Sequence, residues 1–184
     1  MLFARNPFFL FAILNIFSLF RPDFRGLECA RVFSNQGISC SYQLLSAMTF
    51  AIKECSLVLV SVEGIFSNGA VLGNVGTSMI CLVAKMYNVP IMVCCESFKF
   101  IDRVQIDAFV YNELGDSDEV SRLPDGRFGP LYKWKDIDAL RILNLKYDIT
   151  PPELIDVIVT ESGMIPCTSI PVILRLQTSI ERFD

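Results

Sequence analysis

The stretch EGIFSNGAVLGNVGTSMI, residues 63–80, is the one glycine-rich segment of a chain otherwise dominated by aliphatic residues. A glycine loop that leads into a helix can bind phosphate, because backbone N–H groups and the helix N-terminus attract anions. The spacing of Gly69, Gly73 and Gly76 is GxxxGxxG, which matches neither the dinucleotide fingerprint GxGxxG nor the pattern GxxxxGK[ST]. The pattern therefore favours a structural loop with a tight Asn68-Gly69 turn.

Other residue types restrict the chemistry further. The chain contains no histidine, which excludes Ser-His and Cys-His nucleophiles and histidine-ligated zinc. Seven cysteines show no CxxC spacing and mostly lie in apolar runs, so we predict reduced, buried thiols, no metal site and no cofactor. Glu96, with Lys99 nearby, follows a predicted strand where an α/β sheet usually presents its ligands; a satisfied strand-end carboxylate is the competing interpretation.

The elements that would position these residues alternate between strand and helix patterns. Residues 57–62 and 90–95 are continuous apolar runs, typical of parallel strands that are buried on both faces. Residues 147–149 and 156–160 are predicted as later strands, with Pro151-Pro152 opening a short helix between them. The pattern predicts an α/β fold.

Between the first two strands, residues 77–87 are predicted to form a helix. Thr77 is the expected N-cap and Asn88 the expected exit. The apolar face of this helix is expected to comprise Met79, Leu82, Val83 and Met86.

Length and charge indicate one folded domain. The 184 residues are 52% hydrophobic and carry a net charge of −4, with no extended cluster of basic residues. We therefore expect no direct contact with nucleic acid. Residues 114–137 are rich in turn formers and charge and are predicted to be a surface excursion, with Asp116, Asp118 and Glu119 in a solvated loop.

The amino-terminal segment is atypical. Residues 8–20 form an apolar run that would span about 20 Å as a helix, which is short of the roughly 30 Å hydrocarbon core of a membrane. A buried first strand, a signal peptide and a truncation or gene-model artefact remain open for residues 1–22. No membrane association is expected.

Several long motifs, in order, carry a family resemblance. They are NGAVLGNVGT, LVAKMYNVPIMVCCESFKF, RVQIDAFVYNEL and NLKYDITPPEL followed by GMIPC. Together they resemble the carboxy-terminal domain of the initiation factor 2B alpha/beta/delta family, in particular its delta-type members. The family is related to methylthioribose-phosphate and ribose-bisphosphate isomerases. The resemblance implies a Rossmann-like three-layer fold with a mostly parallel sheet, as a single domain at residues 23–184. The family's amino-terminal helical domain is not expected within this sequence.

The resemblance also implies a function. It indicates a cytoplasmic, non-catalytic regulatory subunit of the guanine-nucleotide exchange factor for translation initiation factor 2. The implied partners are the alpha, beta, gamma and epsilon subunits and initiation factor 2 itself. A sugar-phosphate-binding or isomerase domain of the same superfamily is the alternative.

In the isomerases, the equivalent of the opening loop handles a sugar phosphate. The resemblance places Glu63 where they have an aspartate, retains the turn at Asn68 and Gly69, and puts Gly73 and Asn74 in place of an Asn-Lys pair. Relative to the isomerases, two polar side chains of this loop have changed and the positively charged lysine is absent. Because proton transfer needs a positioned acid and base, we expect a degenerate ancestral ligand loop with no catalytic residues.

Residues 141–154, RILNLKYDITPPEL, allow two interpretations. Apolar residues beside charged ones in a strand-and-turn context are commonly ordinary core. The resemblance implies instead that this strand faces a seam between two halves of a complex, with Arg141, Leu143 and Leu145 as interface candidates.

Overall fold

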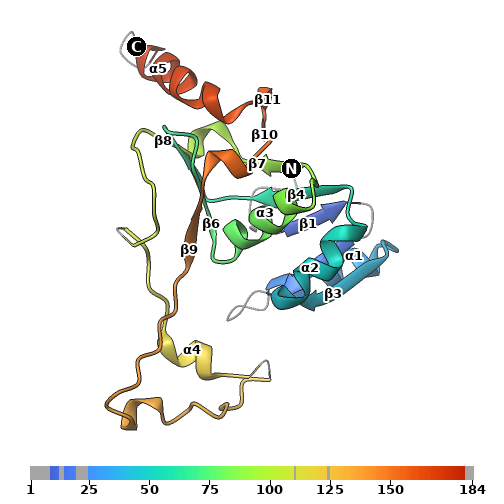
Figure 1. Cartoon of the computed structure of the whole chain (residues 1–184), viewed down its shortest axis with the longest axis vertical. Helices are drawn as coiled ribbons and strands as arrows, with labels where there is room; N and C mark the ends of the chain where they lie inside the picture. The colour runs from blue at the N-terminus through green and yellow to red at the C-terminus, as the bar shows by residue number, and fades with distance from the viewer. Residues whose placement is uncertain (1–8, 13–14, 20–24, 110, 124, 181–184) are drawn as a thin grey trace.

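The computed structural model describes residues 9–12, 15–19, 25–109, 111–123 and 125–180. Its larger sheet contains β1 (Phe9–Ala12), β2 (Asn15–Leu19), β3 (Cys40–Leu44), β4 (Leu57–Ser61), β7 (Ile91–Cys94), β10 (Val157–Thr160) and β11 (Gly163–Ile165). The strands lie in the order β11-β10-β7-β4-β1-β2-β3 (Figure 1). The α/β class predicted from the sequence is confirmed.

Parallel pairing is confined to part of this sheet. Strands β4, β7 and β10 are mutually parallel, as are β2 and β3, whereas β1 is antiparallel to both of its neighbours and β11 is antiparallel to β10. The apolar amino-terminal segment thus contributes two strands, whereas a single buried strand was one of the alternatives left open. The remaining residues of the segment 1–22 lie outside the described part of the chain.

The helices are α1 (Arg25–Asn35), α2 (Met48–Ala51), α3 (Thr77–Met86), α4 (Ser117–Ser121) and α5 (Ile170–Ile180). Short 3-10 turns are η1 (Leu45–Ala47), η2 (Ile52–Glu54), η3 (Ser97–Lys99), η4 (Trp134–Asp136), η5 (Pro152–Leu154) and η6 (Cys167–Ser169). The turn η5 starts at the predicted Pro151-Pro152 pair, because proline is well tolerated in a first helical turn.

The main core lies between the central strands and α3. Val58 and Val60 of β4 pack in one cluster with Ile91 and Val93 of β7 and with buried residues of α2, α3 and α5. The alternate residues of both strands are only half-buried, so the prediction of strands buried on both faces is wrong. Within the described residues, the side chains of these strands are buried on one face of the sheet and only half-buried on the other.

A second sheet was not anticipated from the sequence. It contains β8 (Phe100–Ile101), β5 (Gly64–Phe66), β6 (Val71–Asn74) and β9 (Tyr147–Thr150), in that order. The predicted strand at residues 147–149 therefore pairs with β6 and not with the main sheet. A small separate core of Phe66, Ala70 and Ile149 supports this second sheet.

Helix α3 forms where it was predicted, but its inward face is different. The buried residues are Thr77, Ile80, Cys81 and Ala84. Of the residues expected inside, Met79, Leu82 and Met86 are exposed, and Val83 is only partly buried. The prediction of the apolar face is wrong because apolar residues lie on both sides of α3, and Ile80, Cys81 and Ala84 are the ones that pack in the core.

The N-cap of α3 is Gly76 and not Thr77. Gly76 has a φ of 101°, in the left-handed region that side chains rarely adopt. At the other end, Asn88 follows the helix with a φ of 55°, as expected for its exit.

We predict that Gly76→Val lowers the free energy of unfolding by on the order of 2 kcal/mol, because a β-branched side chain is strained at positive φ. Chemical denaturation followed by circular dichroism measures the change. Asn88→Gly is the control: its φ is also positive, and glycine adopts it without strain. A midpoint for the valine variant equal to the parent's would show that this conformation is not required.

The described residues between β8 and β9, 102–109, 111–123 and 125–146, form an arm that projects away from both sheets (Figure 1). The helix α4 and the turn η4 lie at its far end. The predicted surface excursion at residues 114–137 is the outer part of this arm.

Candidate functional site

The Asn68-Gly69 turn closes the hairpin of β5 and β6. Phe66 N–H donates to the Ala70 carbonyl at 2.8 Å, and Gly69 N–H donates to the Phe66 carbonyl at 2.8 Å. Gly69 has a φ of +80°, as a three-residue hairpin loop requires at its last position. The Asn68 side-chain amide donates to the Gln105 carbonyl at 3.0 Å, so this turn also anchors the base of the arm.

Gly73 lies against the first residue of α3. A Cβ atom added at Gly73 would lie 2.8 Å from Thr77 Cβ and closer still to Thr77 Oγ1. The Thr77 hydroxyl is itself fixed, because it donates to the Asn74 carbonyl at 2.5 Å. This backbone therefore has no room for the asparagine that the isomerase resemblance puts at position 73.

Glu63, Glu96 and Lys99 follow the carboxyl ends of β4 and β7. The Lys99 amine donates to the Val62 carbonyl at 3.4 Å and lies 3.0 Å from the Glu96 carboxylate. Burial opposes ionisation of Glu96, but the hydrogen bond and charge of Lys99 outweigh it and hold the Glu96 pKa below its ordinary value. Glu96 is thus a satisfied carboxylate and a weak base. The group that satisfies it is the Lys99 side chain. Glu63 is half-buried.

Asp148 on β9 is a residue that the sequence analysis overlooked. Its Oδ2 accepts hydrogen bonds from Gly76 N–H at 2.7 Å and from Ser78 N–H at 3.0 Å, at the N-terminus of α3. Its Oδ1 is buried and has no hydrogen-bond partner within the described residues. Burial raises the Asp148 pKa to about 6, and the backbone N–H groups of α3 oppose that rise.

The position of Asp148 bears directly on anion binding. The N-terminus of α3 is the place where a glycine loop would hold a phosphate. Here a carboxylate of the same chain receives those backbone N–H groups. The only indication of Asp148 in the sequence was an acidic residue inside the apolar strand YDIT. The backbone N–H groups that it binds lie 70 residues or more away in the chain.

The three interface candidates lie near one another in sequence but differ in exposure. Leu143 is 66% exposed, whereas Leu145 is half-buried and forms a bridge with Leu114. Arg141 is exposed, and its guanidinium donates to the carbonyls of Asp138 at 2.7 Å and Leu140 at 2.9 Å. All three precede β9 and belong to the returning half of the arm. Their role at an interface stays a prediction.

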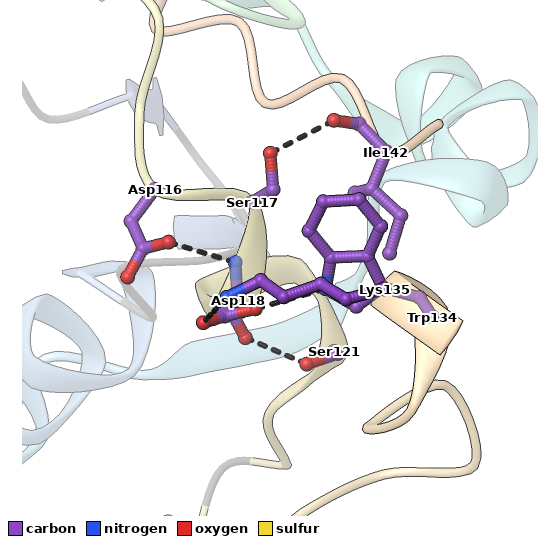
Figure 2. Close-up of polar contacts among 7 residues, drawn as sticks. All are labelled: Asp116, Ser117, Asp118, Ser121, Trp134, Lys135 and Ile142. Carbon is purple, nitrogen blue, oxygen red and sulfur yellow. Dashed lines mark hydrogen bonds and ion pairs between the residues drawn. The ribbon is translucent and has the colours of Figure 1, made fainter. Parts of the chain in front are cut away.

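Asp118 links two parts of the arm tip, as Figure 2 shows. Its carboxylate accepts from Trp134 Nε1 at 2.8 Å and from Lys135 Nζ at 2.7 Å. These hydrogen bonds, from Lys135 first and then from Trp134, lower the Asp118 pKa. Asp116 caps α4 by accepting from Asp118 N–H at 2.9 Å. The prediction of a loop whose acids are merely solvated is therefore wrong for Asp116 and Asp118.

The same tip also holds the segment that carries Leu143. The Ser117 hydroxyl donates to the Ile142 carbonyl at 2.9 Å (Figure 2). The Asn144 side-chain amide donates to the Asp116 carbonyl at 2.9 Å, and Gly115 N–H donates to the Asn144 carbonyl at 2.8 Å. Leu143 is thus held on an ordered backbone while its side chain faces outward.

In the described part of the chain, the cysteine, aspartate and glutamate side chains form no group of three or more that could hold a metal ion. No helix in that part is long and apolar enough to cross a membrane.

Comparison with solved structures shows that they share this fold. A 5-methylthioribose 1-phosphate isomerase from Pyrococcus horikoshii superposes with a TM-score of 0.73 at 19% identity, over 90% of this chain and 45% of the isomerase. At that identity the likeness shows the fold alone.

Sequence comparison then identifies the family. Residues 20–167 match the Initiation factor 2 subunit family, and the chain belongs to it. It is 40% identical to the translation initiation factor eIF2B subunit delta of Schizosaccharomyces pombe, over 84% of this chain and 34% of that protein. It is 34% identical to the ribose 1,5-bisphosphate isomerase of Pyrococcus furiosus, over 79% of this chain and 43% of that protein. The chain thus spans about a third of the length of the Schizosaccharomyces pombe protein.

Proposed function

We propose that this chain is a regulatory, non-catalytic subunit of the guanine-nucleotide exchange factor for translation initiation factor 2. In that role it contributes to assembly of the factor and to the control of translation initiation in the cytoplasm. Its partners are the alpha-, beta-, gamma- and epsilon-type subunits and initiation factor 2. The identity with delta subunits over most of the chain supports this assignment.

The observation that carries the non-catalytic part of the proposal is the closed glycine loop. Thr77 leaves no room for a side chain at Gly73, and Asp148 receives the backbone N–H groups at the start of α3. Glu63 is the acid at the ancestral aspartate position, and nearby Lys99 is engaged by Glu96 and a carbonyl. These contacts support a loop without a free acid–base pair for proton transfer.

The alternative function is an isomerase or sugar-phosphate-binding domain, favoured by the 34% identity to a ribose 1,5-bisphosphate isomerase. We predict that the purified chain does not convert ribose 1,5-bisphosphate or methylthioribose 1-phosphate, as followed by NMR.

We also predict that Glu63→Gln co-purifies with a co-expressed beta-type subunit as the parent does. Turnover by the parent that disappears in Glu63→Gln would contradict the proposal and establish the enzyme.

A further inference from the structure

The arm joins the body of the domain through two segments, and the backbone attaches them differently. The returning segment runs directly into β9, and Val75 N–H of the body donates to the Lys146 carbonyl at 3.0 Å. The outgoing segment is attached to the hairpin of β5 and β6 where Ser67 N–H donates to the Arg103 carbonyl at 3.1 Å. In the described residues 104–109, 111 and 112, the backbone makes no hydrogen bond to other backbone groups. Side chains must therefore fix the direction of the outgoing segment.

Arg103 contacts an aromatic ring on each side of this junction. Its guanidinium carbon lies 5.4 Å from the centre of the Phe66 ring and 4.6 Å from the centre of the Tyr111 ring. Phe66 is buried in the small core of the second sheet, whereas Tyr111 is 73% exposed on the arm. A guanidinium is planar, and aromatic faces within about 6 Å attract it. Arg103 thus connects the core of the body to the arm.

Gln105 holds the Arg103 guanidinium in place. This buried side chain accepts a hydrogen bond at its Oε1 from Arg103 Nη2 at 3.1 Å, and its Nε2 donates to the Asp107 carbonyl at 2.9 Å. Its backbone carbonyl accepts from the Asn68 side chain in the turn of the hairpin. Because one buried residue bonds the hairpin, the arginine and the arm, the guanidinium has a defined position.

The two halves of the arm meet directly after Tyr111. The side-chain amide of Asn112 donates to the Tyr147 carbonyl at 2.7 Å, and its Oδ1 accepts from Tyr147 N–H at 3.3 Å. Tyr111 itself has a φ of 79°, a strained conformation that persists only where the surroundings hold it. A restraint on Tyr111 therefore acts at the point where the outgoing and returning segments come together.

Beyond this junction the arm is one ordered unit. Lys146 N–H donates to the Glu113 carbonyl at 3.1 Å, and Leu114 and Leu145 form a bridge. The exposed interface candidate Leu143 belongs to the same unit. The direction of the arm at its base therefore decides where Leu143 lies relative to the body.

We propose that Arg103 positions the arm: its guanidinium, held between the rings of Phe66 and Tyr111, fixes the direction in which the arm leaves the body. The inference rests on the proposed function, because it names the residue that prepares the arm and Leu143 for a partner subunit. A segment that is fixed before binding loses less conformational entropy when it binds. Arg103 is thus a positioning residue for assembly.

Double electron–electron resonance measures the direction of the arm in the purified full chain. Nitroxide labels are attached to p-acetylphenylalanine in place of Arg127, exposed near the arm tip, and in place of Met164, exposed on β11 in the body. This chemistry leaves the seven cysteines unlabelled. The parent should give one narrow distance distribution. Arg103→Gln should give a broader one, because glutamine cannot stack between the two rings.

A second pair of labels tests whether the body itself changes. It replaces Ser34, which is exposed on α1, and Met164, so both labels lie outside the arm. This pair should give the same distribution in the parent and in Arg103→Gln. Broadening of both pairs would overturn the proposal, because Arg103 would then support the fold of the body and not the direction of the arm.

Two substitutions of Tyr111 separate its ring from its hydroxyl. Tyr111→Leu removes the ring and should broaden the arm-to-body distribution, whereas Tyr111→Phe keeps the ring and should match the parent. Arg31→Gln is the matched control for Arg103→Gln, since Arg31 is an exposed arginine of α1. An unchanged distribution in Arg103→Gln or Tyr111→Leu, or equal broadening in Tyr111→Phe, would overturn the proposal.

Association with a co-expressed beta-type subunit gives the functional readout. Arg103→Gln and Tyr111→Leu should each weaken it about fivefold, the factor that one exposed cation–π contact is worth. Tyr111→Phe and Arg31→Gln should associate like the parent. Equal association of the parent and all variants would overturn the positioning role and leave the proposed function standing. Failure of the parent to associate would overturn the proposed function, while the distances within the single chain would still decide whether Arg103 sets the direction of the arm.

Discussion

Asp148→Ala is expected to lower the free energy of unfolding by about 2 kcal/mol at pH 7. The change removes the acceptor for Gly76 N–H and Ser78 N–H, and an unsatisfied buried donor costs about 1–3 kcal/mol. It also separates β9 from the start of α3 and so loosens the contact between the second sheet and the main core. Urea denaturation followed by circular dichroism measures the loss. Equal midpoints for variant and parent would contradict this role.

The pH dependence of the same site has a definite sign. Burial places the folded-state pKa of Asp148 at about 6, above the ordinary value of 3.8. Folding therefore favours the protonated acid, and the stability from this group is complete below pH 3.8 and is lost as the pH rises through 6. From pH 7 to pH 5, the parent should gain about 1 kcal/mol through this group. Asp148→Asn, which cannot titrate, should show a flatter profile, and an unchanged slope would contradict the assignment.

Leu143→Asp is expected to weaken assembly of the exchange-factor complex by about thirtyfold or more. Truncating or charging a buried interface anchor commonly costs about 2 kcal/mol or more. Leu143 is 66% exposed in the single chain, so the isolated variant should fold as the parent does. Sedimentation of the co-expressed complex measures association, and circular dichroism of the variant alone measures folding.

Met164→Asp is the control for this prediction, because Met164 is 69% exposed on β11 and lies outside the arm. Leu145→Asp would be less informative, since Leu145 is half-buried and contributes to the fold of the arm. A Leu143→Asp chain that folds and sediments with its partners like the parent would show that this residue is not at an interface.

The sequence was most informative where the pattern is local. The apolar runs at β4 and β7, helix α3 and the Pro-Pro turn at η5 are each specified by a few consecutive residues. The inward face of α3 was not predictable in the same way, because apolar residues lie on both sides of that helix. The buried face comprises Thr77, Ile80, Cys81 and Ala84, and the longer Met79, Leu82 and Met86 lie on the exposed side.

Long-range features were not predictable from local pattern. Asp148 meets the N-terminus of α3 across 70 or more residues, and the second sheet pairs β6 with β9 across a similar separation. The turn formers at residues 114–137 indicated an excursion, but not that Asp118 would join Trp134 and Lys135 into a fixed tip. Such contacts depend on which distant segments the fold brings together, and short-range periodicity does not encode this.

The mass of the complex formed with a co-expressed beta-type subunit tests the central claim most directly. Analytical ultracentrifugation of the purified pair, with turnover of ribose 1,5-bisphosphate followed in the same sample, measures assembly and catalysis together. The proposed function predicts a stable hetero-oligomer that contains both chains and converts no sugar phosphate. A chain that sediments apart from the beta-type subunit and isomerises the sugar phosphate would contradict it.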